Sequence, residues 1–137
     1  MIMSRERSYL LDTMTLLWLA FLPKRLPRTA RTVILDATSP LRFSIVSLWE
    51  IGLKMSVGGY PDFKLPEDWE ICIPEGLKQQ GIELLSLDAL HCRRIQDLPF
   101  HHKDPFDRML AAQCQVDGLA ILSSDAIFDA YGVRRVW

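Results

Sequence analysis

Short apolar runs alternate with longer helix-forming segments along most of this sequence. Five such runs, each with the length of a buried strand, occur at 9–12, 41–45, 82–86, 119–123 and 133–137. Strands separated by helices pair in parallel through right-handed crossovers, and the helices then lie on both faces of one sheet. The alternation therefore predicts an α/β fold of three layers, with a mostly parallel five-stranded sheet between two layers of helices.

Local signals predict where the helices begin and end. Thr13 or Thr15 is expected to cap the first helix, and Ser44 or Ser47 begins another that ends at Gly58-Gly59. The remaining helices are expected at 27–37, 67–80 with a kink at Pro74, 88–97, 105–117 and 126–131.

Composition limits the kind of protein. The 137 residues, 49% of them hydrophobic, suffice for one core, so a single domain over 1–137 is expected. A net charge of −1 gives no general attraction for nucleic acid, so any polyanion site must be local. Three cysteines without a C-x-x-C pair favour a reducing, cytoplasmic location over a disulfide or zinc framework. The apolar run 10–22 is too short to span a bilayer, so no membrane association is expected.

The most informative stretch is Asp104-Pro105-Phe106-Asp107, at the start of the helix expected at 105–117. Asp104 suits the N-cap, and Pro105 suits the first helical position, where a missing N–H does no harm. Asp107 then lies beside the positive end of the helix dipole. Helix capping alone explains both aspartates, so this stretch indicates a catalytic site only if other acids lie at the same place.

Three other acids are expected at the same edge of the sheet. Asp12 and Asp125 lie at the ends of strands, and Glu50 lies near the start of the helix that follows the second strand. Ligands bind beyond the carboxyl ends of parallel strands. Glu50 has a structural explanation of its own, because Ser47-x-x-Glu50 has the form of a capping box. The topology predicts one shared mouth for four residues, here named the acid cluster: Asp12, Glu50, Asp107 and Asp125.

Four carboxylates at close range repel one another and raise one another's pKa unless a cation neutralises them. Lys54 and Arg108 are the bases nearest in sequence, too few to balance four acids. Oxygen ligands without a nearby cysteine favour Mg²⁺, or Mn²⁺, over zinc. Two such ions can activate water and stabilise the leaving oxygen in phosphodiester cleavage. His101 and His102 border the expected mouth and are possible ligands or bases, but paired histidines in a surface loop are more often simply solvated.

Four segments follow one another with a recognisable spacing. They are Leu10-Leu11-Asp12-Thr13, Ser47-Leu48-Trp49-Glu50-Ile51-x-x-Lys54, Leu98-Pro99-x-His101-x-x-Asp104-Pro105-Phe106-Asp107-Arg108-x-x-Ala111-x-Gln113 and Ser123-x-Asp125-x-x-Phe128-x-x-Tyr131. In this order, over residues 10–137, they resemble the PIN-domain ribonucleases, and among these the VapC-type toxins of bacterial toxin–antitoxin modules. Met14 stands where many relatives have a polar residue, and Ser123 stands where threonine is usual.

The resemblance implies a PIN-like nuclease domain that cleaves RNA with Mg²⁺, is repressed by a cognate antitoxin and forms a homodimer. It implies catalytic roles for the whole acid cluster, with Asp12, Asp107 and Asp125 as metal ligands. Glu50 would be a further ligand through water, or the group that orients the attacking water. Lys54 and Arg108 are weaker candidates for holding the substrate phosphate.

Two other classes of function stay open. One is a different Mg²⁺-dependent phosphoryl-transfer domain, such as a haloacid-dehalogenase-like phosphatase or a receiver domain. The phosphatase needs a second aspartate where this chain has Met14, and the receiver needs a lysine near its last strand, where this chain has Arg134 and Arg135. The other class is a non-catalytic binding module whose acids only cap helices, which a metal titration distinguishes because caps need no Mg²⁺.

Overall fold

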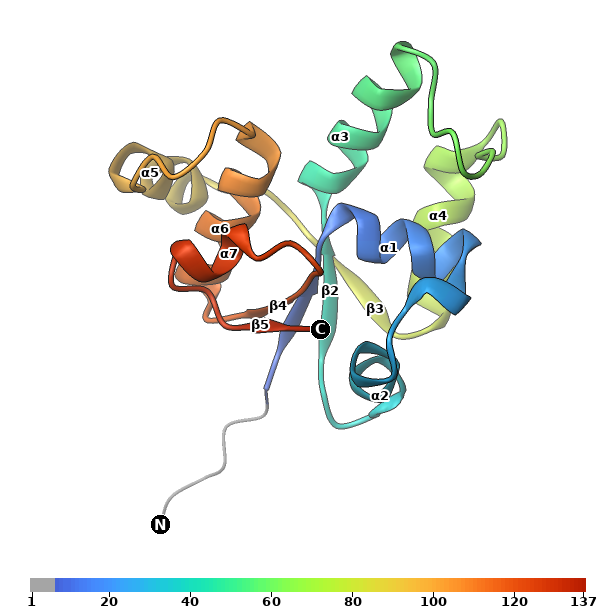
Figure 1. Ribbon diagram of the computed structural model, residues 1–137, viewed down its shortest axis with the longest axis horizontal. Helices are drawn as coiled ribbons and strands as arrows, with labels where there is room; N and C mark the ends of the chain where they lie inside the picture. Colours follow the sequence, from blue (N-terminus) through green and yellow to red (C-terminus); the bar gives the residue numbers. More distant parts are fainter. Residues whose placement is uncertain (1–6) are drawn as a thin grey trace.

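The computed structural model describes residues 7–137 (Figure 1). Its sheet has five strands in the order β3-β2-β1-β4-β5, and every neighbouring pair is parallel. The predicted α/β fold is confirmed, with a sheet that is wholly rather than mostly parallel. The strands are β1 (Tyr9–Leu11), β2 (Leu41–Ser44), β3 (Ile82–Leu85), β4 (Ala120–Leu122) and β5 (Arg135–Val136).

All the predicted helices are present, and most are shorter than expected at one or both ends. The helix at 105–117 has the expected bounds, and the first helix begins at Thr13 and is capped by Asp12 rather than by a threonine. None of the helices in the described residues is long and apolar enough to cross a bilayer. They are α1 (Thr13–Phe21), η1 (Pro23–Arg25, a 3₁₀ turn), α2 (Arg28–Leu35), α3 (Ile45–Ser56), α4 (Trp69–Gln79), α5 (Ala89–Asp97), α6 (Pro105–Asp117) and α7 (Ile127–Ala130).

Two hydrophobic cores lie on opposite faces of the sheet. Tyr9 and Leu11 of β1 pack in one core with residues of α1 and α4, whereas Leu10 packs in the other with residues of α6 and α7. Figure 1 shows α1, α2 and α4 on one side of the sheet and α5, α6 and α7 on the other. Because successive strand residues point to opposite faces, a sheet covered on both sides needs apolar residues at every position. This explains why β1 and β4 are uninterrupted apolar runs.

The central strand β1 fixes where a ligand can bind. Its neighbours are β2 on one side and β4 on the other, so the chain connections diverge at the carboxyl end of β1 and leave a crevice there. Asp12 follows β1 directly, and Asp125 follows β4 closely. Gly118, in the left-handed conformation with φ 69°, turns the chain from α6 into β4. Because α6 leads back into β4, the first turn of α6, with Asp107, lies at the same edge.

Candidate metal centre

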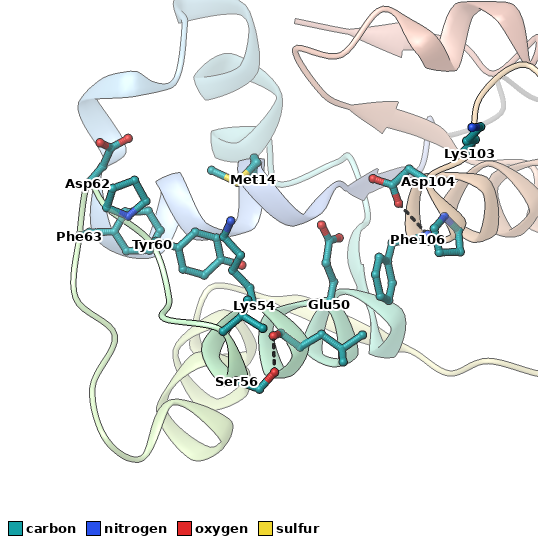
Figure 2. A pocket seen from close by; sticks show the side chains of 14 residues that line it. Met14, Glu50, Lys54, Ser56, Tyr60, Asp62, Phe63, Lys103, Asp104 and Phe106 are labelled. Atoms are coloured by element: carbon teal, nitrogen blue, oxygen red, sulfur yellow. Dashed lines mark hydrogen bonds between the residues drawn. The ribbon is translucent and has the colours of Figure 1, made fainter.

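A cavity of about 760 Å³ opens beside the crevice, between α3, the start of α1 and the segment before α6 (Figure 2). Glu50 and Asp104 line its acidic end, and Lys54 and Tyr60 line it farther along α3. Apolar side chains form much of the remaining wall: Met14, Leu53, Val57, Phe63 and Phe106. A ligand held by the acids would therefore have an apolar surface next to it.

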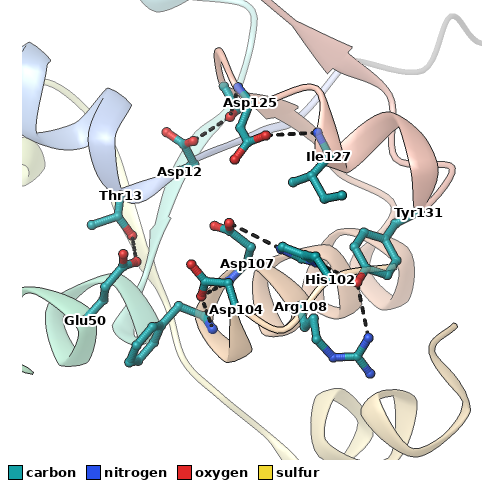
Figure 3. Close-up of polar contacts among 12 residues, drawn as sticks. Asp12, Thr13, Glu50, His102, Asp104, Asp107, Arg108, Asp125, Ile127 and Tyr131 are labelled. Carbon is teal, nitrogen blue, oxygen red and sulfur yellow. Dashed lines mark hydrogen bonds and ion pairs between the residues drawn. The ribbon is translucent and has the colours of Figure 1, made fainter. Parts of the chain in front are cut away.

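The acid cluster surrounds one mouth at the carboxyl edge of the sheet (Figure 3). Its members come from the end of β1, the second turn of α3, the first turn of α6 and the loop after β4. The structure thus brings together all four acids that the topology predicted there. Their role as metal ligands stays a prediction.

Asp12 is held by hydrogen bonds to both of its carboxylate oxygens. Oδ1 accepts the backbone N–H of Thr15 at 2.8 Å, and Oδ2 accepts the hydroxyl of Ser123. Ser123 also accepts the backbone N–H of Asp125 at 2.9 Å, so one buried hydroxyl links two members of the acid cluster. Burial raises the pKa of Asp12, although the bonds from Ser123 and Thr15 oppose this effect.

Glu50 is not part of a capping box, and that structural explanation is wrong. Ser44 caps α3 by accepting the backbone N–H of Val46 at 3.0 Å, so Ser47 lies inside the helix and Glu50 lies one turn farther on than a capping glutamate. The hydroxyl of Thr13 donates instead to Glu50 Oε1 at 2.6 Å. Glu50 is therefore free to act in the mouth, with one of its oxygens fixed.

Burial is also the largest influence on Glu50 and raises its pKa. The hydrogen bond from Thr13 lowers it, and the charges of Asp104 and Asp12 raise it again. Lys54, one turn along α3, lowers it only slightly. Negative charge therefore exceeds positive charge around this carboxylate.

Asp107 shows the strongest effect of crowding. Burial and neighbouring charges together raise its pKa to about 8; burial contributes most, followed by the charges of Asp104, Glu50, Asp12 and Asp125. Asp104 caps α6 as predicted, because its Oδ1 accepts the N–H groups of Phe106 at 2.9 Å and Asp107 at 3.3 Å. Its charge nevertheless makes it a fifth acid beside the cluster. The i, i+3 spacing of the two aspartates, which places them on one side of the helix start, was the signal for this in the sequence.

Arg108 does not face the mouth, and its suggested contact with substrate phosphate is wrong. Its side chain is buried, and its guanidinium donates to the carbonyls of Pro99 at 2.8 Å and Leu98 at 3.3 Å. It also donates to the Tyr131 hydroxyl at 3.2 Å and lies 4.1 Å from the ring centre of Phe100. Arg108 anchors the loop before α6.

The sequence reasoning placed His102 at the border of the mouth but favoured a solvated side chain, and it missed the two contacts that this side chain makes. Its Nε2 lies 3.4 Å from Asp107 Oδ2, and its Nδ1 lies 2.8 Å from the hydroxyl of Tyr131. His101, by contrast, is exposed and only packs edge-on against Tyr131. Of the two adjacent histidines, His102 therefore contacts the acid cluster, whereas His101 lies at the surface.

The donor chemistry of the acid cluster fits a hard divalent cation. The side-chain oxygens that it offers are all carboxylate oxygens, and burial, together with the charges of neighbouring acids, raises the pKa of Asp12, Glu50 and Asp107. Within residues 7–137, no three histidine, cysteine or acidic side chains are already grouped closely enough to hold an ion. The fit to a divalent cation therefore rests on the chemistry of the donor set.

Comparisons with known proteins agree with this fold. The family model of the PIN domain matches residues 9–133. No curated protein sequence matches the chain.

Solved structures with a similar fold include VapBC from Salmonella typhimurium bound to DNA (TM-score 0.66, 18% identity, 94% of this chain and 96% of that one). VapBC2 from Rickettsia felis, bound to a promoter DNA fragment, has a TM-score of 0.64 at 11% identity, over 93% and 96% of the chains. VapBC-1 from nontypeable Haemophilus influenzae has a TM-score of 0.60 at 16% identity, with the same coverage. At these identities the likeness concerns the fold, whereas the family model covers nearly the whole sequence: this chain belongs to the PIN domain family.

Proposed function

We propose that this PIN domain is a metal-dependent endoribonuclease of the VapC type, the toxin of a toxin–antitoxin pair. The observation that carries the proposal is the acid cluster, in which burial and mutual repulsion raise the pKa of three carboxylates. Membership of the PIN domain family and the fold shared with VapBC complexes support the same function.

Asp12, Asp107 and Asp125 would hold Mg²⁺ or Mn²⁺. When bound, the ion supplies Lewis acidity, which lowers the pKa of water and neutralises charge on the phosphate. These carboxylates are prepared for this task by their neighbours, because Ser123 holds Asp12 and the Ile127 N–H donates to Asp125 at 3.0 Å.

Glu50 is suited to orient a water molecule and to take its proton. Thr13 fixes its Oε1, which leaves Oε2 for the mouth. A carboxylate whose pKa is raised by burial is a better proton acceptor near neutral pH than an exposed one. Lys54 stays the candidate for holding a phosphate group, because it shares the cavity with Glu50.

An apolar stripe along α3 supports a protein partner. Ile45, Trp49, Leu53 and Val57 follow one another at intervals of one turn, and between 38% and 80% of each is exposed. Exposed apolar patches of this kind mark interaction surfaces. Leu53 and Val57 also line the cavity, so a partner on the stripe would restrict access to the acids. This arrangement suits both an inhibiting antitoxin and a homodimer.

The test is cleavage of single-stranded RNA by the purified protein, with Mg²⁺ or with EDTA. We expect cleavage only with the metal, with 5′-phosphate and 3′-hydroxyl ends, and no cleavage by Asp107→Asn. Glu83→Gln is the matched control, since it neutralises an exposed acid on β3 and should cleave normally. Cleavage that persists in EDTA, or ends with 2′,3′-cyclic phosphate, would contradict the proposal.

A further inference from the structure

We propose that His102 is a positioning residue that holds Asp107 in the orientation needed for metal binding. It does so as the last link of a hydrogen-bond chain that runs from Arg108 through Tyr131 (Figure 3). The inference rests on the proposed function, because it assigns a partner to one of the proposed metal ligands.

The direction of the chain follows from the donors available. Arginine has hydrogen-bond donors only, so the Tyr131 oxygen must accept from Arg108 Nη1 at 3.2 Å. Within the described residues the Tyr131 hydroxyl makes no other hydrogen bond, so we assign its single proton to His102 Nδ1, which lies 2.8 Å away. Tyr131 is 5% exposed, so water has little access to compete for this proton.

The tautomer of His102 follows in turn. Because Nδ1 accepts from Tyr131, the proton of the neutral ring is on Nε2, the nitrogen that faces Asp107 Oδ2 at 3.4 Å. This bond is long, and the charge of an ionised carboxylate would strengthen it. Every donor in the chain thus points toward Asp107, and each bond polarises the next.

The hydrogen-bond chain fixes one carboxylate oxygen of Asp107 and leaves the other directed to the mouth. His102 occupies the side of Oδ2, away from the rest of the acid cluster (Figure 3). Arg108 keeps the support rigid, because its bonds to the carbonyls of Leu98 and Pro99 anchor the loop that carries His102. Partners that orient ligating groups commonly change metal affinity by about 10- to 100-fold when removed.

The first measurement is the tautomer of His102 in the metal-free protein, from imidazole ¹⁵N shifts at pH 8.5, where an ordinary histidine is neutral. We expect the proton on Nε2, and we expect Tyr131→Phe to remove this preference. A proton on Nδ1 in the wild type would overturn the inference without reference to catalysis.

The second measurement is Mn²⁺ affinity by titration calorimetry. A glutamine amide reaches the place of Nε2, whereas an asparagine amide reaches only that of Nδ1. His102→Ala and His102→Asn should therefore bind Mn²⁺ about tenfold more weakly, and His102→Gln should bind close to wild type. His101→Ala is the matched control and should not change affinity, because within residues 7–137 its ring packs edge-on against Tyr131 and pairs with no acid.

Thermal melts of the metal-free variants are the control that checks whether each variant is folded. Wild-type affinity in His102→Ala, or equal losses in His102→Gln and His102→Ala, would overturn the positioning role. If the wild type binds no Mn²⁺, the proposed function fails, whereas the tautomer still decides whether the hydrogen-bond chain exists.

Discussion

Replacing Asp107 with asparagine should stabilise the metal-free protein while abolishing cleavage. The carboxylate lies among like charges and is only 20% exposed at its side chain, so ionising it opposes folding. Asparagine has the same shape and no charge. The opposing contribution is the interaction of Asp107 with the N-terminus of α6, whose loss costs up to about 1 kcal/mol.

The magnitude follows from the pKa of Asp107. Its folded-state pKa of about 8 lies above the ordinary value of 3.8, so protons favour the folded state. The wild type therefore loses stability as the pH rises from about 4 to about 8, and the variant does not share this loss. Four pKa units correspond to a ceiling of about 5 kcal/mol, which screening by water at a partly open site reduces. After subtracting the helix contribution, we expect a net gain of about 1–2 kcal/mol at pH 8.5.

Thermal melts in EDTA at pH 4.5 and pH 8.5 measure this difference, with Glu83→Gln as the control for loss of an exposed charge. The gain should be a few degrees at pH 8.5 and nearly absent at pH 4.5. Mg²⁺ should then stabilise the wild type more than Asp107→Asn. A variant less stable than wild type at pH 8.5 would mean that Asp107 is chiefly a helix-terminus charge. Equal stabilisation of both proteins by Mg²⁺ would mean that Asp107 is not part of a metal site.

Three other variants have distinct expected results. Asp104→Asn should fold and cleave nearly normally, because asparagine also caps helices. NMR titration should show a lower pKa for Asp107 in this variant. Loss of cleavage as complete as in Asp107→Asn would contradict this expectation. Arg108→Ala should lower the free energy of unfolding by about 2–4 kcal/mol in urea melts, because three acceptors, in two buried hydrogen bonds and one partly buried one, lose their donor. A change in KM for RNA without a change in stability would contradict this. Asp125→Asn should abolish cleavage in the RNA assay and reduce stabilisation by Mg²⁺ in melts, and retention of both would remove Asp125 from the site.

The sequence predicted the sheet and the position of the acids because both follow from topology. Asp12 and Asp125 end strands, and parallel strands share one carboxyl edge, so no side-chain detail was needed. Arg108 could not be placed in this way: its direction depends on the path of the loop at 98–104, whose carbonyls it contacts.

Local motifs gave wrong predictions where a residue distant in sequence contacts the same side chain. The Ser47-x-x-Glu50 spacing fits a capping box, but Ser44 begins the helix earlier and Thr13 hydrogen-bonds both Ser47 and Glu50. Thr13 lies 37 residues from Glu50 in the chain, a separation that no local pattern reports. The contact of His102 with Tyr131 was missed for the same reason, since it joins residues 29 positions apart.

The bond between Ser123 and Asp12 joins residues 111 positions apart, and this has a consequence during synthesis on the ribosome. β1 is made well before its neighbour β4 and the loop with Ser123 and Asp125. Contacts this distant in sequence form late in folding. A nascent chain therefore lacks a complete acid cluster until residues 120–125 have emerged, and if the protein is a toxic nuclease, the RNA being translated is safe from it until then.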